Sequence, residues 1–250
     1  MRFTWLFIIA ELLFLDVHAQ KIVPGEWEAQ ESIWVPFLSQ SVRSSEDSIT
    51  VQLIKKLSEH MNTVIVVEDD SVINRGKSLF ARFNVDTSKI RLVKISPINM
   101  WLRDIGPVFF YSGENADMLS ICNFKFTSYR NIPYEEVTDH TQLLDASGRK
   151  IGDLEGIQVH ESELVLEGGA FEVNGKGCII LVDSLVLKRN QSFSKEQIEN
   201  ELAVKLGIKS FIWLRQGLAQ DPCVRRRCNR QPPARPARNA APGGYLAWSS

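Results

Sequence analysis

A Trp, an Arg and an Asp occur within four residues in the stretch 99–107, which reads Asn-Met-Trp-Leu-Arg-Asp-Ile-Gly-Pro. The final Gly-Pro interrupts the backbone, and apolar runs at 90–95 and 108–111 lie on either side. This pattern predicts a loop between two strands, and such loops commonly carry binding and catalytic side chains. The alternative is a rim loop in which Arg103 and Asp104 pair with each other or face solvent.

A second loop further along the chain reads Leu-Glu-Gly-Gly-Ala-Phe-Glu-Val-Asn-Gly-Lys-Gly. The glycines that follow Glu167, which are Gly168 and Gly169, leave its side chain uncovered and let a ligand approach the backbone closely. Together with Asp104, Glu167 gives two acids at the ends of separate strands, and Trp101 lies beside the first of them. A planar guanidinium cation requires this combination, with carboxylates for its N–H groups and an aromatic wall for its face.

The segments before the first loop alternate between strand and helix patterns. Strands are expected at 33–35, 62–67 and 90–95, and helices at 46–60 and 71–83. This alternation predicts an α/β layer whose strands are buried on both faces. In the first helix we expect a single buried face, formed by Ile49, Leu53, Ile54 and Leu57.

After the first loop, residues 108–166 are expected to be mainly extended, with a turn at 145–149. Asn-Gly at 174–175 predicts a hairpin between strands at 170–173 and 178–182. A helix is expected at 194–206, opened by a capping box in which Ser194 and Gln197 take part. We expect Trp27 to lie in the core, and His140 and His160 to lie on the surface, because no Ser or Cys here has the small-residue turn of an exposed nucleophile.

The composition excludes several classes of protein. The chain has 250 residues, of which 44% are hydrophobic and 24% are charged, and its net charge is −1. The apolar fraction is large enough for a hydrophobic core. The net charge near zero provides no overall positive field that would attract nucleic acid. The four cysteines form no Cys-x-x-Cys pair, so neither a metal site nor a disulfide-dependent fold is expected.

Both ends of the chain differ from the middle. Residues 1–19 combine Arg2, an apolar run and small residues at the end, which predicts a signal peptide, although an ordinary apolar N-terminus is the alternative. The run is too short to span a bilayer. The protein would then be secreted or periplasmic, and otherwise cytoplasmic. Residues 223–250 are rich in Arg and Pro, lack Lys, Asp and Glu, and are expected to be disordered. This tail is interpreted as non-native sequence, with a basic binding arm as the alternative.

The motifs together resemble those of the agmatine deiminase and bacterial-type (Porphyromonas-type) peptidylarginine deiminase family. The resemblance extends over about 22–222 and rests on segments that follow in the family's order, namely Pro-Gly-Glu-Trp-Glu-Ala-Gln-Glu-Ser-Ile-Trp at 24–34, the two loops above, Leu-Lys-Arg-Asn at 187–190 and Ile-Trp-Leu-Arg-Gln-Gly-Leu-Ala-Gln-Asp-Pro at 212–222. It implies that residues 20–222 form a partial deiminase domain with a pentein-type α/β propeller of ββαβ modules, here an incomplete ring.

The resemblance also implies a hydrolase that needs no cofactor. A cysteine thiolate would attack the guanidinium carbon, and agmatine would give N-carbamoylputrescine and ammonia, a step of putrescine biosynthesis. Carried over by motif, Asp104 is a catalytic carboxylate that binds guanidinium and Trp101 packs against the substrate. Glu167, Gly168 and Gly169 would line the channel. The partners expected are a small-molecule or peptidyl guanidine, without nucleic acid or membrane, and a homodimer is left open.

Departures from the family pattern leave other readings open. After Asp-Pro the family continues with Gly-His-x-Asp and a later nucleophilic cysteine, whereas Cys-Val-Arg-Arg-Arg-Cys follows Pro222 here. The chain is therefore expected to be an incomplete and inactive copy. Residues 123–134 also lack the agmatine-type Asn-x-Trp-Gly-Gly run, which leaves peptidylarginine deiminase as an alternative. A non-catalytic guanidine-binding module and a secreted interaction fragment are the remaining readings.

Overall fold

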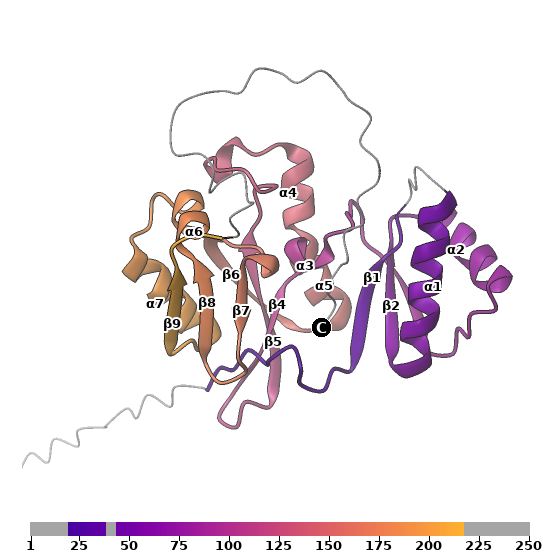
Figure 1. Cartoon of the computed structure of the whole chain (residues 1–250), viewed down its shortest axis with the longest axis horizontal. Coiled ribbons are helices and arrows are strands. Elements are labelled where there is room, and N and C mark those ends of the chain that lie inside the picture. Colours follow the sequence, from indigo (N-terminus) through magenta and orange to yellow (C-terminus); the bar gives the residue numbers. More distant parts are fainter. Residues whose placement is uncertain (1–19, 39–43, 218–250) are drawn as a thin grey trace, which may run out of the picture.

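The computed structural model describes residues 20–38 and 44–217 of the chain (Figure 1). The predicted signal peptide at 1–19 and the predicted disordered tail at 223–250 lie outside these residues. The described part contains three sheets of three strands each, with helices packed around them. The mixed α/β class is therefore confirmed. None of the helices within the described ranges is long and apolar enough to cross a membrane.

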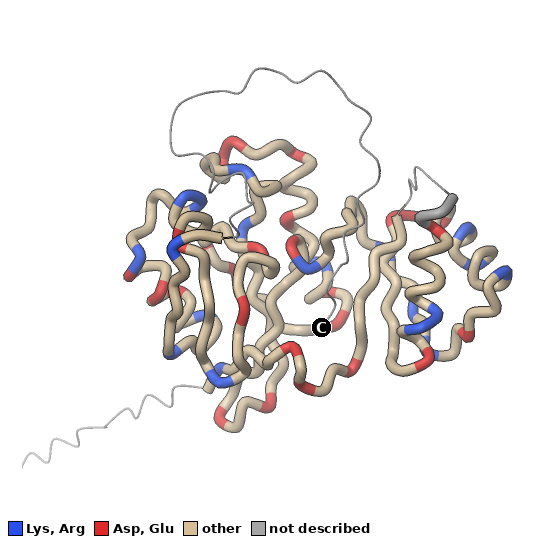
Figure 2. The backbone as a smooth tube through the Cα atoms, in the orientation of Figure 1, with Lys and Arg blue, Asp and Glu red and all other residues tan. Residues whose placement is uncertain are grey.

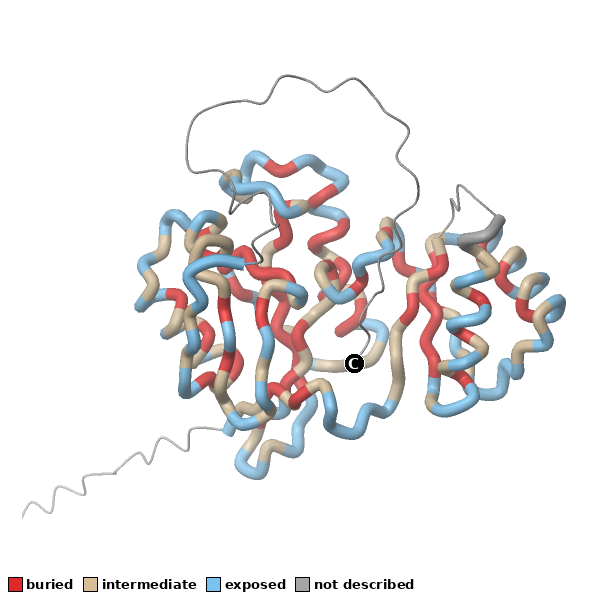
Figure 3. Tube along the Cα trace, viewed as in Figure 1, coloured by how far each residue is buried: buried red, intermediate tan, exposed pale blue. Residues whose placement is uncertain are grey.

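The first sheet is entirely parallel and lies at the right of Figure 1. Its strands are β1 (Ser32–Pro36), β2 (Asn62–Val67) and β3 (Ile90–Lys94), connected by α1 (Ser44–His60) and α2 (Asp70–Arg82). Five consecutive residues of β2 are buried, as Figure 3 shows along its length. A strand covered on both faces is a continuous apolar run, which is why this sequence could be recognised as a central parallel strand.

The second and third sheets both have the order strand, strand, helix, strand. The second contains β4 (Val108–Ser112), β5 (Met118–Lys125) and β6 (Gln158–Val165), and the third contains β7 (Phe171–Val173), β8 (Cys178–Val182) and β9 (Ser210–Leu214). In each sheet the first two strands are antiparallel and the last two are parallel. The first sheet differs, since a helix precedes each of its later strands. Within the described ranges, the three sheets lie side by side without sharing a strand.

Two elements of the third sheet are confirmed as predicted. The Asn174-Gly175 turn joins β7 to β8, with Gly175 at φ +69°, where a side chain would be strained. Between β8 and β9 lie α6 (Asp183–Arg189) and α7 (Lys195–Leu206). Both hydrogen bonds of the predicted capping box are present at the start of α7.

The expectation that 108–166 is mainly extended is wrong for residues 134–155. This part contains η1 (Tyr134–Glu136), α4 (Asp139–Asp145) and α5 (Ser147–Glu155), so the turn predicted at 145–149 is the junction of two helices. Thr138 caps α4 and Gly156, at φ +65°, ends α5. The helical period is hard to recognise in the sequence because only Leu144 and Ile151 of these helices are large buried side chains.

Two burial predictions are also wrong. Trp27, expected in the core, is 73% exposed. In α1 the buried face is formed by Val51 and Ile54, whereas Ile49 and Leu53 are exposed. Only Ile54, and Leu57 in part, follow the prediction. The apolar residues of α1 surround much of the helix, so their spacing alone did not determine which stripe faces β2.

Candidate functional site

The stretch 99–107 forms one helical turn, α3 (Leu102–Ile105), rather than an open loop. Leu102 and Ile105 are buried in an apolar cluster beneath the turn. The Asn99 side chain accepts the Trp101 N–H at 2.8 Å, and Gly106 closes the turn by donating to the Leu102 carbonyl at 2.7 Å. With its apolar residues anchored below, α3 carries its polar residues on the opposite side.

Asp104 connects α3 to the second predicted loop. Its Oδ1 accepts the Gly169 N–H at 3.0 Å, and its Oδ2 accepts the Tyr129 hydroxyl at 2.7 Å. A Cβ at Gly169 would lie 2.3 Å from Oδ1, so this close approach requires glycine. The two loops singled out in the sequence therefore meet directly, through η2 (Gly168–Ala170).

Glu167 lies directly before η2, and its side chain is 2% exposed, so the expectation that the following glycines leave it uncovered is wrong. It forms an ion pair with the guanidinium of Arg189 at the end of α6, whose side chain is also buried. The other oxygen, Oε1, is buried without a hydrogen-bond partner among the described residues. Burial raises the pKa of Glu167, and the charge of Asp104 adds to the increase, whereas Arg189 opposes it.

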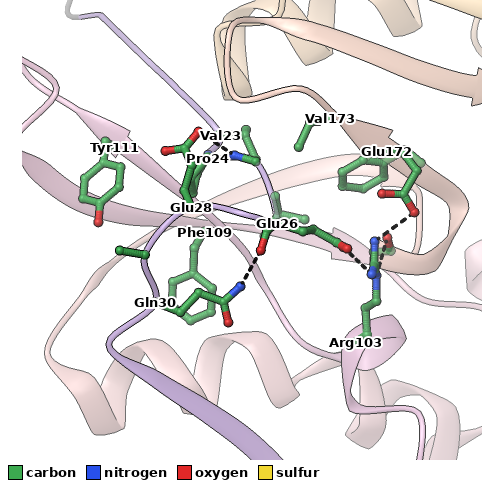
Figure 4. Close-up of a pocket in the computed structure, with 15 residues that line it drawn as sticks. Val23, Pro24, Glu26, Glu28, Gln30, Arg103, Phe109, Tyr111, Glu172 and Val173 are labelled. Atoms are coloured by element: carbon green, nitrogen blue, oxygen red, sulfur yellow. Dashed lines mark hydrogen bonds and ion pairs between the residues drawn. The ribbon is translucent and has the colours of Figure 1, made fainter. Parts of the chain in front are cut away.

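Arg103 and Asp104 are adjacent in the sequence and have different partners. The Arg103 guanidinium pairs with Glu26 and, at 3.3 Å, with Glu172, and its Nε donates to the Gly168 carbonyl at 3.1 Å (Figure 4). This contradicts the alternative in which the two neighbours pair with each other. Arg103 thus holds η2 from one side while Asp104 holds it from the other. Figure 2 shows the opposite charges next to each other along α3.

A cavity of about 420 Å³ lies on the Arg103 side. It is formed by the N-terminal segment 23–30 together with β4 and β7, and Phe109 and Tyr111 contribute aromatic surface to it (Figure 4). Two of the acids that line the cavity, Glu26 and Glu172, are paired with Arg103. The described lining therefore does not indicate a particular reaction. Asp104 does not line it.

Two aromatic residues are connected to Asp104, Tyr129 through its hydroxyl and Trp101 through its backbone carbonyl, which accepts the Asp104 N–H at 3.0 Å. Trp101, predicted from its motif, is 54% exposed. Tyr129, which the sequence did not indicate, is 45% exposed and reaches Asp104 from the loop after β5. Burial and then the hydrogen bond to Asp104 raise the pKa of the Tyr129 hydroxyl, which therefore stays protonated as a donor.

Neither cysteine in the described ranges resembles an activated nucleophile. Cys122 is fully buried on β5, and burial raises its pKa to about 12. Cys178 begins β8 at the hairpin turn, the opposite end of that hairpin from η2. His140 is exposed as predicted. His160 is half-buried, with its ring centroid 5.4 Å from that of Phe110, so the surface prediction is only partly right there.

The chain is similar to known proteins over most of its length. The sequence model of the Porphyromonas-type peptidyl-arginine deiminase family matches residues 22–225. An agmatine deiminase of Medicago truncatula is 28% identical over 207 residues, which is 80% of this chain and 54% of that protein. An agmatine deiminase of Ectopseudomonas mendocina is 34% identical over 150 residues, 56% of this chain and 38% of that one.

Solved structures agree at the level of the fold. The agmatine deiminase of C. jejuni superposes with a TM-score of 0.66 at 20% identity, covering 81% of this chain and 58% of that one. For the agmatine deiminase of Enterococcus faecalis the TM-score is 0.61 at 23% identity, with coverages of 79% and 53%. The matched curated relatives are longer proteins, and this chain spans about half of their length. The match of the family's sequence model over most of the chain shows that the protein belongs to the Porphyromonas-type peptidyl-arginine deiminase family.

Proposed function

We propose that the chain carries the guanidinium-binding carboxylate of an agmatine deiminase-type hydrolase. The observation that supports this proposal is the state of Asp104, which is held on each oxygen by one neutral donor and is paired with no cation among the described residues. A carboxylate has about four acceptor positions, so two remain for the parallel N–H groups of a guanidinium. Trp101, exposed at the start of the same helical turn, would offer an aromatic face for the same cation.

Glu167, Gly168 and Gly169 have a supporting role in this proposal. Arg189 neutralises Glu167, and Oε1 is buried without a partner among the described residues, so in this proposal Glu167 supports η2 rather than contacting the guanidinium. The glycines bring η2 against α3, which fixes the Asp104 carboxylate in one orientation. Pre-positioned acceptors bind a cation without paying for reorganisation when the ligand arrives.

The reaction proposed for the family is hydrolysis of the bound guanidine. A thiolate attacks the guanidinium carbon, the carbon–nitrogen bond to ammonia breaks, and water then releases the ureido product from sulfur. Agmatine would give N-carbamoylputrescine. We propose that the chain does not catalyse this by itself, since Cys122 is inert and Cys178 lies away from η2 among the described residues. The similarity to solved agmatine deiminases supports placing the three sheets in a pentein-type propeller.

Peptidylarginine is the second candidate substrate. The observation in its favour is that residues 123–134 do not contain Asn-x-Trp-Gly-Gly, and that Tyr129 occupies this segment beside Asp104. An arginyl peptide and agmatine present the same guanidinium, so Asp104 would bind either. Binding of a short arginyl peptide more tightly than agmatine would favour this candidate.

Calorimetric titration of the purified chain with agmatine tests the proposal. We expect the chain to bind agmatine more tightly than cadaverine, a diamine without guanidinium, and Asp104→Asn to lower the agmatine affinity by about 10- to 100-fold. Asp117→Asn, which removes an exposed acid in the β4–β5 connection, is the matched control and should change nothing. Equal affinity for the two ligands would refute guanidinium binding. Ammonia release from agmatine above a buffer control would refute the lack of turnover.

A further inference from the structure

The hydroxyl of Tyr129 is one of the two donors that fix Asp104, and it comes from a different loop than the other. It reaches Oδ2 at 2.7 Å, while the backbone of Gly169 holds Oδ1 at 3.0 Å. A carboxylate with one donor on each oxygen cannot rotate freely about its Cβ–Cγ bond. Its plane, and therefore the direction of its remaining lone pairs, is determined by these two contacts.

The backbone around Tyr129 adopts an unfavourable conformation that places this side chain. Ser128 and Tyr129 both have positive φ, at 51° and 63°. Residues other than Gly and Asn rarely adopt this backbone conformation. Strain of this kind persists only where the surrounding contacts impose it, and it concentrates at functional sites. The Tyr129 ring packs edge-on against Phe126, with a centroid distance of 5.3 Å.

Contacts beneath the loop hold that strained turn in place. Phe126 donates its N–H to Asp145 at 2.6 Å, and the Thr127 hydroxyl donates to the Arg130 carbonyl at 2.7 Å. The Ser128 and Thr141 hydroxyls lie 2.9 Å apart. Every residue from 126 to 129 therefore has a hydrogen bond to a defined partner. These contacts fix the loop from Phe126 onward, and the last of them is the hydrogen bond from Tyr129 to Asp104.

We propose that Tyr129 is a positioning residue that makes Asp104 selective for guanidinium over ammonium. This inference rests on the proposed function. A guanidinium binds a carboxylate through two parallel N–H groups in one plane, so it benefits from a carboxylate plane fixed in advance. An ammonium group is a compact point charge with rotatable donors and has no such requirement. Without the Tyr129 hydroxyl the Asp104 carboxylate can rotate more freely. This weakens the binding of guanidinium and leaves the binding of ammonium nearly unchanged.

The test compares affinities of the full chain for agmatine and cadaverine by calorimetric titration. In Tyr129→Phe we expect the affinity for agmatine to fall about tenfold and that for cadaverine to stay within about twofold, so that the ratio of the two collapses. Tyr111→Phe is the matched control. Tyr111 is an exposed tyrosine on β4 whose hydroxyl has no hydrogen-bond partner among the described residues, and loss of that hydroxyl should leave the ratio unchanged.

The possible results separate the two proposals. A wild-type chain without preference for agmatine overturns the proposed function and this inference with it. A wild-type preference that survives in Tyr129→Phe overturns the inference alone. Equal weakening of both ligands also overturns it, because it indicates a merely structural role. Should Tyr129→Phe not fold, the carbon-13 resonance of the wild-type Tyr129 ring replaces it as the readout. This resonance should shift with agmatine and not with cadaverine, and the same shift with both would contradict the proposal.

Discussion

The turns at α3 and η2 each carry one carboxylate, and the two carboxylates are satisfied in opposite ways. Asp104 on α3 is half-buried, and within the described ranges it accepts only from neutral donors, the Tyr129 hydroxyl and the Gly169 N–H. Glu167 beside η2 is almost completely buried and is paired with Arg189. Neutral donors orient a negative charge without cancelling it, whereas a buried cation cancels it.

This difference assigns the two acids different tasks. Asp104 keeps its charge for a ligand, so its replacement should affect binding more than folding. The charge of Glu167 is already neutralised by its ion pair with Arg189, so replacing either residue should affect folding more than binding. Two acids in similar sequence contexts, each beside a turn between strands, therefore do not form an equivalent pair of ligand carboxylates.

The largest effect is expected from Arg189→Met, which leaves the Glu167 carboxylate buried without its cation. Breaking a buried pair from one side typically costs about 3–5 kcal/mol of the free energy of unfolding. Urea denaturation of the purified chain measures it. Lys94→Met is the control, because Lys94 pairs with Asp70 at 3.2 Å where both side chains are exposed, and such pairs contribute about 0–1 kcal/mol.

A double variant sharpens the same comparison. Glu167→Met combined with Arg189→Met removes both buried charges, and it should recover part of the stability that Arg189→Met loses. Arg189→Met costing no more than Lys94→Met would show that Glu167 is not held by this ion pair. The distinction drawn between the two carboxylates would then be wrong.

The second effect concerns the contact between the two turns. Gly169→Ala would place a Cβ 2.3 Å from Asp104 Oδ1, so either the hydrogen bond or the turn must shift. Forcing an extra methyl group into a packed site typically costs about 1–3 kcal/mol, and the agmatine affinity should fall with it because Asp104 loses a donor. Thermal denaturation and agmatine titration measure the two consequences.

Gly76→Ala provides the matched control for that substitution. A Cβ at Gly76 would lie 3.5 Å from Phe37, an ordinary contact, and alanine favours a helix interior such as that of α2. We expect its stability to stay the same or rise. Unchanged agmatine binding in Gly169→Ala would mean that the Gly169 N–H does not position Asp104.

The sequence indicated the parts of this site that depend on local chemistry. The pair Gly168 and Gly169 indicated a close approach of the backbone. Asp104 was recognised because it lies just before Gly106-Pro107, which interrupts regular secondary structure. The ion pair of Glu167 could not be predicted, because Arg189 lies at the end of α6 and no local pattern links the two. Tyr129 was missed for a similar reason. Its position depends on two consecutive residues at positive φ, neither of which is Gly or Asn.

The fold divides in the same way. The continuous apolar run of β2, the Asn174-Gly175 turn and the capping box of α7 are signals contained within a few residues, and all three predictions are confirmed. The helices α4 and α5 were missed because their buried faces are completed by small or polar residues. Asp145 belongs to this group, although it supports the loop that carries Tyr129.

The smallest of these effects concerns Asp145, which combines the features of the two carboxylates compared above. It is buried like Glu167, and like Asp104 it accepts from neutral donors, the Tyr134 hydroxyl and the Phe126 N–H, both at 2.6 Å. Burial raises the pKa of Asp145 despite these hydrogen bonds. The folded chain therefore binds this proton more tightly than the unfolded chain does, and the stability that the group contributes is fully present below the ordinary Asp pKa of about 4.

That contribution should be lost as the pH rises from about 4 through the raised pKa of Asp145. Asp145→Asn, which cannot ionise, should remove this part of the pH dependence when the free energy of unfolding is measured by urea denaturation at a series of pH values. Asp139→Asn, an exposed acid at the start of the same helix, should leave the profile as it is in the wild-type chain. If Asp145→Asn left the slope unchanged instead, burial would not govern the ionisation of Asp145. The hydrogen bonds to Tyr134 and Phe126 would then be sufficient to keep a carboxylate charged in the interior, and neutral donors alone could hold a buried charge where Glu167 uses Arg189.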